Sequence, residues 1–236
     1  MNAREAILTA VRSNLPQPPV PLPEIPTFWQ TGEPHPQGCQ QSHDPGEGSN
    51  SSEFNRELQA IGGSSFKVAD AQAAQAKLKE LFPNAKVVCS AVPDVPGTRH
   101  IADVRDPHEL DDVDVGIVRS PLGVAEAGAV WVTQKELVIN ALGVLSQHLI
   151  VLLDPAAIVQ TMHDAYNRIA LTESPYGVFL AGPSATGDIE GVMVRGAQGA
   201  RSLTVLFMSC ANTSISGGLC PPCVLREMQK GDCDRR

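Results

Sequence analysis

The sequence predicts an α/β fold in which a mostly parallel sheet lies between helices. Short, continuously apolar runs recur between residues 54 and 207, and segments with helical apolar spacing separate them. Strands that are apolar on both faces are typical of a parallel sheet covered by helices. The 236 residues are 42% hydrophobic and 19% charged, which is the balance of a globular domain. Right-handed crossovers would make the fold broadly Rossmann-like, but the chain has no GxGxxG fingerprint of a nicotinamide site.

Helices are predicted where apolar residues return every three or four positions. Phe54 and Leu58 belong to a first helix of the domain that ends at Gly62. Asp70 caps a second helix, because its carboxylate can accept hydrogen bonds from free backbone N–H groups. A third helix is expected from Asp154-Pro155 to about Ile169. The apolar runs predicted as strands are residues 86–89, 115–118, 128–132, 149–153, 177–181 and 202–207.

The chain divides into four predicted regions. They are an N-terminal helix (1–15), a Pro/Gly/Ser-rich linker arm (16–52), the α/β domain (53–208) and a cysteine-containing tail (209–236). Proline fixes φ and removes a hydrogen-bond donor, so the linker is expected to be extended. A short amphipathic helix on such a leash, with Phe28-Trp29 as an apolar anchor, is expected to serve assembly. The tail is expected to be dispensable for folding, because the last predicted strand ends near Phe207.

The charge and the apolar runs exclude several classes of protein. The formal charge of −8 argues against a nucleic-acid or anionic-membrane surface. No apolar run approaches the roughly 18 residues of a membrane span, and the N-terminus has no apolar signal core. We therefore expect a cytoplasmic protein.

Four of the six cysteines lie in the tail, as Cys210, Cys220, Cys223 and Cys233. Four thiolates can bind zinc or an iron–sulfur cluster, and Cys220–Cys223 is a CxxC pair. A second CxxC and a thioredoxin-like unit are both missing, which favours free thiols. No metal site and no cofactor are therefore predicted in this chain.

Two loops are candidates for chemistry, because ligands of such sheets bind beyond the ends of strands. In the first, Gly182–Glu190, the side chains of Ser184, Thr186 and Asp188 precede an expected short helix whose N-terminus could hold an anion; the alternative is a simple helix cap. In the second, Glu126 lies among Val, Ala and Gly residues. Burial there would raise its pKa and suit it as a general acid–base or a nucleophile; the alternative is a turn glutamate facing water. We expect the two loops to share one pocket.

Two further features have mainly structural interpretations. His148 precedes an apolar strand, and a lone histidine is more often structural than functional. A catalytic or ligand-binding role for His148 stays open. The run Asp111–Asp114 lacks the glycine and the distal glutamate of a calcium loop, which predicts a solvated acidic turn.

Residues 54–207 resemble the lactate-utilization protein C family, also called the LUD-domain family. The motifs that carry the resemblance are residues 125–132, 148–154, 162–166, 182–190 and 196–203. The family usually has Thr at Ala127, a basic residue at Ala185, Ala at Gly187 and His at Gln198. The resemblance implies a fold similar to the NagB, ribose-5-phosphate isomerase and CoA-transferase group. It also implies ligand-binding roles for Gly182, Ser184, Thr186, Asp188, Glu190, Gly199 and Arg201.

The resemblance further implies a role in oxidising L-lactate to pyruvate, beside two iron–sulfur subunits encoded with the protein. Glu126 is placed like the loop glutamate of CoA-transferase-type sites, which is an analogy of fold. The first hypothesis is therefore a subunit of a lactate-utilization system. The alternatives are an enzyme acting through Glu126, or a sensor, that binds a small carboxylate, sugar phosphate or acyl-CoA-like ligand. Homo-oligomerisation stays open.

Overall fold

The computed structural model describes residues 2–15 and 49–209. Helix α1 (Ala3–Ser13) forms as its spacing predicts, and the Asn2 side chain and Glu5 cap its N-terminus reciprocally. Its apolar side chains Ile7 and Val11 are exposed. Most of the predicted linker and nearly all of the tail lie outside the described residues.

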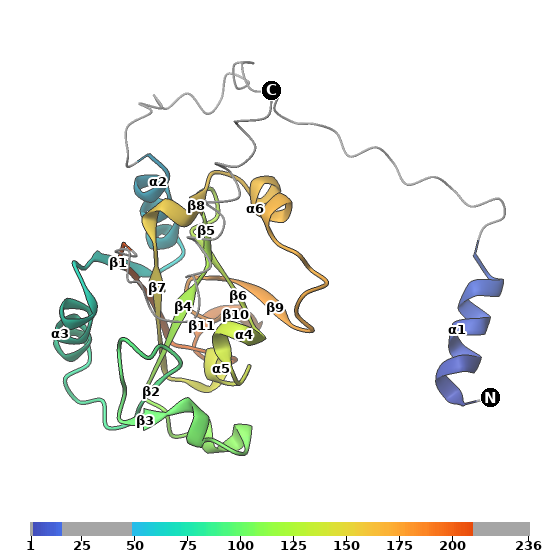
Figure 1. Cartoon of the computed structure of the whole chain (residues 1–236), viewed down its shortest axis with the longest axis horizontal. Helices are drawn as coiled ribbons and strands as arrows, with labels where there is room; N and C mark the ends of the chain where they lie inside the picture. The colour runs from blue at the N-terminus through green and yellow to red at the C-terminus, as the bar shows by residue number, and fades with distance from the viewer. Residues whose placement is uncertain (1, 16–48, 210–236) are drawn as a thin grey trace, which may run out of the picture. The chain divides into compact units, whose positions relative to one another are not determined.

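Residues 49–209 are built on a six-stranded sheet in which every strand pairs in parallel with its neighbours. The strand order is β1-β12-β7-β4-β2-β3, so the last strand lies between the first strand and β7 (Figure 1). The bounds are β1 (Ser64–Lys67), β2 (Val88–Ser90), β3 (Arg99–His100), β4 (Val115–Ser120), β7 (His148–Leu153) and β12 (Ser202–Phe207). The predicted α/β class with a mostly parallel sheet is confirmed.

Each face of this sheet is covered by its own core. Helix α3 (Ala71–Leu81), capped by Asp70 as predicted, packs Ala74 against the face that carries Ile150 and Leu152. Helix α2 (Ser49–Ala60) packs Phe54 and Leu58 against the opposite face. Helix α2 begins at Ser49, so residues 49–52 are helical although they were predicted as linker.

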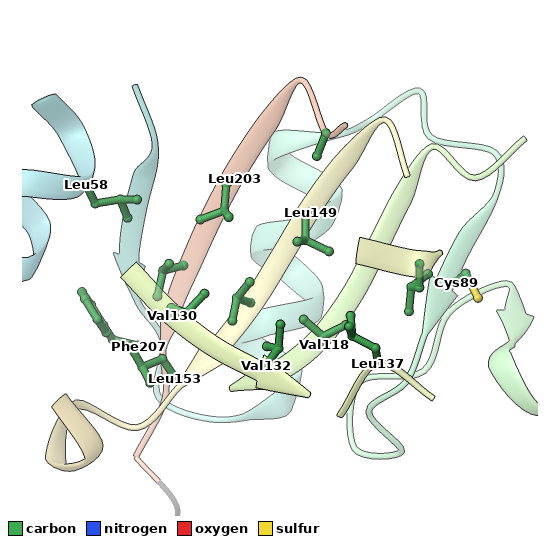
Figure 2. Packing of buried hydrophobic residues seen from close by; sticks show 14 of the residues in the cluster. Leu58, Cys89, Val118, Val130, Val132, Leu137, Leu149, Leu153, Leu203 and Phe207 are labelled. Carbon is green, nitrogen blue, oxygen red and sulfur yellow. The ribbon is translucent and has the colours of Figure 1, made fainter. Parts of the chain in front are cut away.

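A second, mixed sheet covers the same face as α2. Its order is β8-β5-β6-β9, and its strands are β5 (Leu122–Val124), β6 (Ala129–Thr133), β8 (Ile158–Val159) and β9 (Gly177–Ala181). Val130 and Val132 of β6 lie over Leu149 and Leu153 of β7 (Figure 2). Two runs predicted for the main sheet, 128–132 and 177–181, therefore belong to this second sheet, where they pair antiparallel. Pro121, between β4 and β5, cannot donate to a ladder, and the chain leaves the main sheet there.

The single helix predicted from Asp154 to Ile169 is wrong. Asp154 caps only the 3₁₀ helix η3 (Pro155–Ala157), and the next two residues form β8 beside β5. Both β8 residues are β-branched and buried, which favours a strand over a helical stripe. A new capping box at Thr161 and Asp164 then starts α6 (Met162–Arg168).

The remaining elements are short. They are the 3₁₀ helices η1 (Ile101–Asp103) and η2 (Pro107–Leu110), helices α4 (Gln134–Leu137) and α5 (Leu142–Leu145), and the hairpin of β10 (Ala185–Ile189) and β11 (Val192–Arg195). None of the helices described is long and apolar enough to cross a membrane.

Candidate functional site

Glu126 lies in the turn between β5 and β6, and its side chain is exposed. Its Oε1 accepts a hydrogen bond from Met162 N at 2.6 Å, and its backbone N–H donates to Gln160 O at 3.1 Å. The expected desolvation of this carboxylate is therefore wrong, because Glu126 is a water-facing turn residue. It holds the first residue of α6.

The segment Gly182–Glu190 is followed by no helix. Residues 185–189 are a strand of the β10–β11 hairpin, so both the helix-terminal anion cradle and the helix-cap alternative are wrong. Asp188 and Glu190 are exposed on this hairpin, and Thr186 Oγ1 accepts from Asp188 N at 3.3 Å. Gly182, with φ +70°, packs against Ile61 at the end of α2.

Three of the predicted ligand-binding residues are brought together. Ser184 N donates to Ala200 O at 2.9 Å, and Gly199 packs directly on the Ser184 side chain. Arg201 N in turn donates to Gln147 O at 2.8 Å. Ser184, Gly199 and Arg201 therefore gather beside the amino ends of β7 and β12.

Glu126 and Ser184 do not share the predicted pocket. The partners of Glu126 belong to the segment that follows the carboxyl end of β7, whereas those of Ser184 precede the amino end of β12. Neither the cavity of about 350 Å³ beside Arg99 nor the cavity of about 270 Å³ beside His148 is lined by Glu126 or by residues 182–190. The rule that favours carboxyl ends of strands therefore misplaced the first loop, Gly182–Glu190.

His148, whose catalytic or ligand-binding role the sequence left open, lies at the edge of the main sheet where β7 and β12 begin. His148 Nδ1 is 2.7 Å from Ser202 Oγ, and its ring lies 4.6 Å from that of Phe82. Burial lowers the pKa of His148, and the charge of Arg201 lowers it further while Asp114 opposes the shift. A cavity of about 270 Å³ opens beside the ring, and its lining consists of Leu81, Phe82, Pro83, Asn84, Ala85, Asp114 and His148. We call this cavity the His148 niche.

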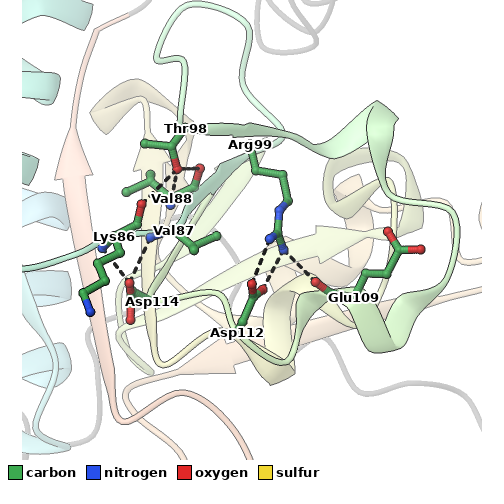
Figure 3. A network of polar contacts seen from close by, with 8 residues as sticks. All are labelled: Lys86, Val87, Val88, Thr98, Arg99, Glu109, Asp112 and Asp114. Carbon is green, nitrogen blue, oxygen red and sulfur yellow. Dashed lines mark hydrogen bonds and ion pairs between the residues drawn. The ribbon is translucent and has the colours of Figure 1, made fainter.

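The acidic run at residues 111–114 is not merely a solvated turn. Asp114 Oδ2 accepts from Lys86 N at 2.6 Å and from Val87 N at 2.9 Å, which joins the start of β4 to the segment before β2 (Figure 3). Asp112 binds Arg99 through both oxygens, at 2.6 and 2.8 Å. A cavity of about 350 Å³ beside Arg99 is lined mainly by carboxylates. These contacts hold together the segments that surround β2 and β3 at one edge of the sheet.

Within residues 2–15 and 49–209, no three His, Cys, Asp or Glu side chains are grouped to hold a metal ion. Cys89 is buried in β2, and burial raises the pKa of its thiol. The four tail cysteines lie outside the described residues.

Comparisons with known proteins identify the family. The family model described as the LUD domain matches residues 94–208. The chain contains a LUD domain. This match runs from just before β3 through the end of β12, so it includes Glu126, His148 and the segment Gly182–Arg201. Residues 81–85, which form the other side of the His148 niche, lie before it.

The fold has a solved counterpart. A crystal structure of a DUF162 family protein from Deinococcus radiodurans superposes with a TM-score of 0.56. The two sequences are 16% identical, and the match covers 70% of this chain and 99% of the other. No curated protein sequence matches the chain significantly.

Proposed function

We propose that the protein is a subunit of a lactate-utilization system, which oxidises L-lactate to pyruvate, and that it acts with iron–sulfur partner subunits. The observation that carries the proposal is the LUD domain over residues 94–208, since this family is associated with lactate utilization in general. The parallel sheet and its connections agree with the fold implied by that family.

The test combines growth with purification. A strain lacking the protein should fail to grow on L-lactate, and the full chain should restore growth. The tagged full chain should co-purify from lactate-grown cells with the iron–sulfur subunits encoded beside it, measured as bound iron and by mass spectrometry. Normal growth of the deletion strain on L-lactate would remove the proposal.

A second candidate is a small-carboxylate enzyme or sensor, favoured by the His148 niche. The niche has a mostly apolar wall with two titratable groups, the His148 imidazole and the Asp114 carboxylate, and the charge of Arg201 acts on His148 from outside the lining. A small anion would bind through the imidazole and Arg201, against the charge of Asp114. Isothermal titration of the full chain with L-lactate and with inorganic phosphate tests this function. Binding heat that is measured with wild type but not with the His148→Gln variant would support this function. No binding heat with wild type would exclude the function for these ligands.

A further inference from the structure

The segment Leu137–Leu145, which contains α4's last residue and all of α5, includes a strained turn. Val138 has φ +61° and ψ −54°, and Ile139 N donates to Leu137 O at 2.6 Å. This closes a γ-turn of the positive-φ kind, which is rare and strained, above all for a β-branched residue. Strained backbone of this kind is concentrated at sites where a protein binds something.

A second destabilising feature of this segment is at Asn140, two residues after Val138. The side-chain oxygen Oδ1 of Asn140 is buried without a hydrogen-bond partner among the described residues. A buried acceptor that is left unsatisfied destabilises the folded state, and native proteins contain few of them. The same short segment therefore combines two features that packing of the free protein does not explain.

The segment also exposes apolar side chains. Val138 is 47% exposed, Val144 43% and Leu145 38%. We call these three residues the 137–145 surface. Three exposed apolar side chains within one nine-residue segment indicate a binding surface, whereas single ones are ordinary.

The surroundings of this surface are charged asymmetrically. Helix α5 contacts η2, whose residues and neighbours include three carboxylates, Asp106, Glu109 and Asp111, beside Arg105 and His108. On another side, Val144 lies next to Gly199, two residues before Arg201. The apolar centre therefore has a mostly acidic rim on the η2 side.

We propose that the 137–145 surface is the docking site of an iron–sulfur partner subunit that has apolar side chains surrounded by lysine or arginine. This inference rests on the proposed function. Charge decides against a second copy of the chain at this surface, because the acidic η2 rims of two copies would meet and repel each other. A basic-rimmed partner would gain both burial of the apolar centre and attraction to the rim.

The experiment co-expresses the full chain with the two iron–sulfur subunits encoded beside it and measures binding of the purified components. Leu145→Asp should weaken binding at least tenfold. The matched control is Leu171→Asp, at another exposed leucine outside the surface, which should bind like wild type; a Tm measurement checks that both variants are folded. Asp111→Lys should slow association, and the loss should shrink at high salt.

The outcomes separate the two proposals. If wild type binds the iron–sulfur subunits and Leu145→Asp binds equally well, the surface is wrong and the proposed function stands. If wild type does not bind them at all, the partner assignment fails together with the surface. If Leu145→Asp instead dissolves a homodimer seen by light scattering, the occupant is a second copy and this inference is overturned.

Discussion

His148 Nδ1 lies 2.7 Å from Ser202 Oγ, so a side-chain contact joins the first residues of the adjacent strands β7 and β12. The same ring packs on Phe82, which caps the C-terminus of α3. One imidazole therefore ties two strands to the helix that covers them. The charges that act on it are those of Arg201, before β12, and Asp114, before β4.

This contact predicts a pH dependence of stability. Burial and Arg201 hold the pKa of His148 below its ordinary value of 6.5, so the unfolded chain takes up the proton more readily. The His148 contribution is therefore fully present above pH 6.5 and is lost as the pH falls through the folded-state pKa. In urea unfolding, wild type should lose stability relative to His148→Gln between pH 8 and pH 5. Parallel stability curves for the two proteins would contradict this.

Asp114 should stabilise the sheet edge. The N–H groups of Val87 and Lys86 lower its pKa, so its contribution is present at neutral pH and is lost as the pH falls through that lowered pKa. Asp114→Ala leaves two donors without their acceptor and should cost about 1–3 kcal/mol of unfolding free energy. Asp111→Ala, its exposed neighbour, should change stability by less than about 0.5 kcal/mol. Equal effects of the two variants in urea unfolding would refute the role of Asp114.

Glu126 gives a test that separates chemistry from structure. Glu126→Gln keeps an oxygen that can accept from Met162 N, whereas Glu126→Ala removes it. If the carboxylate only holds α6, Glu126→Gln should support growth on L-lactate, and Glu126→Ala should lose about 1 kcal/mol of stability. If Glu126 is an acid–base or a nucleophile, Glu126→Gln should abolish growth at unchanged Tm. We expect the structural outcome, because the side chain is exposed.

Gly128 should tolerate no side chain. It has φ +55°, and a Cβ there would clash with the backbone of Leu58 in α2. Gly128→Ala should cost more than about 1 kcal/mol, because both the conformation and the close approach are lost. At Gly187 an added Cβ meets nothing within 4 Å, so Gly187→Ala should be nearly neutral. Thermal unfolding compares the two; similar shifts in Tm would show that the approach to α2 is not tight.

Removal of residues 1–48 should leave the LUD domain folded and weaken its self-association or partner capture. The cut must precede Ser49, because Asn50 Nδ2 donates to Ile158 O at 3.0 Å and belongs to α2. Helix α1 exposes Ile7 and Val11 and is too short to be stable alone in water, which favours a role in assembly. Sedimentation of the truncated and full chains measures the effect; unchanged association would assign the arm another role.

Sequence patterns located six of the twelve strands described, and two of these six, β6 and β9, were assigned to the wrong sheet. Continuous apolar runs such as Leu149–Leu153 were sufficient, because both faces of that strand are buried. The edge strand Ser64–Lys67 was missed, since Phe66 is its sole large apolar residue. The pairing of β6 with β5 across the turn 125–128 is local and was not recognised, whereas its antiparallel pairing with β9 is set by tertiary contact.

The site was harder to predict than the fold. The structure brings together Ser184, Gly199 and Arg201, three of the residues to which the resemblance gave a ligand-binding role. The exposure of Glu126 could not be read from its small neighbours. Asp114 was missed because its partners are backbone N–H groups 27 and 28 residues away, and backbone donors leave no mark in a sequence. The general preference for carboxyl ends of strands also fails where a hairpin returns the chain to the amino edge.

The position of β12 between β1 and β7 has a consequence for how the protein is made. The central sheet is incomplete until residues 202–207 have been synthesised, because among the described residues β1 pairs only with β12. Until then the hydrogen-bonding edges of both neighbouring strands stay open, and such edges template aggregation. Pairings as distant as Ser64 with Thr204 also slow the search for the native state. A nascent chain that stops short of Phe207 therefore holds a divided sheet, and chaperones would meet it in that form.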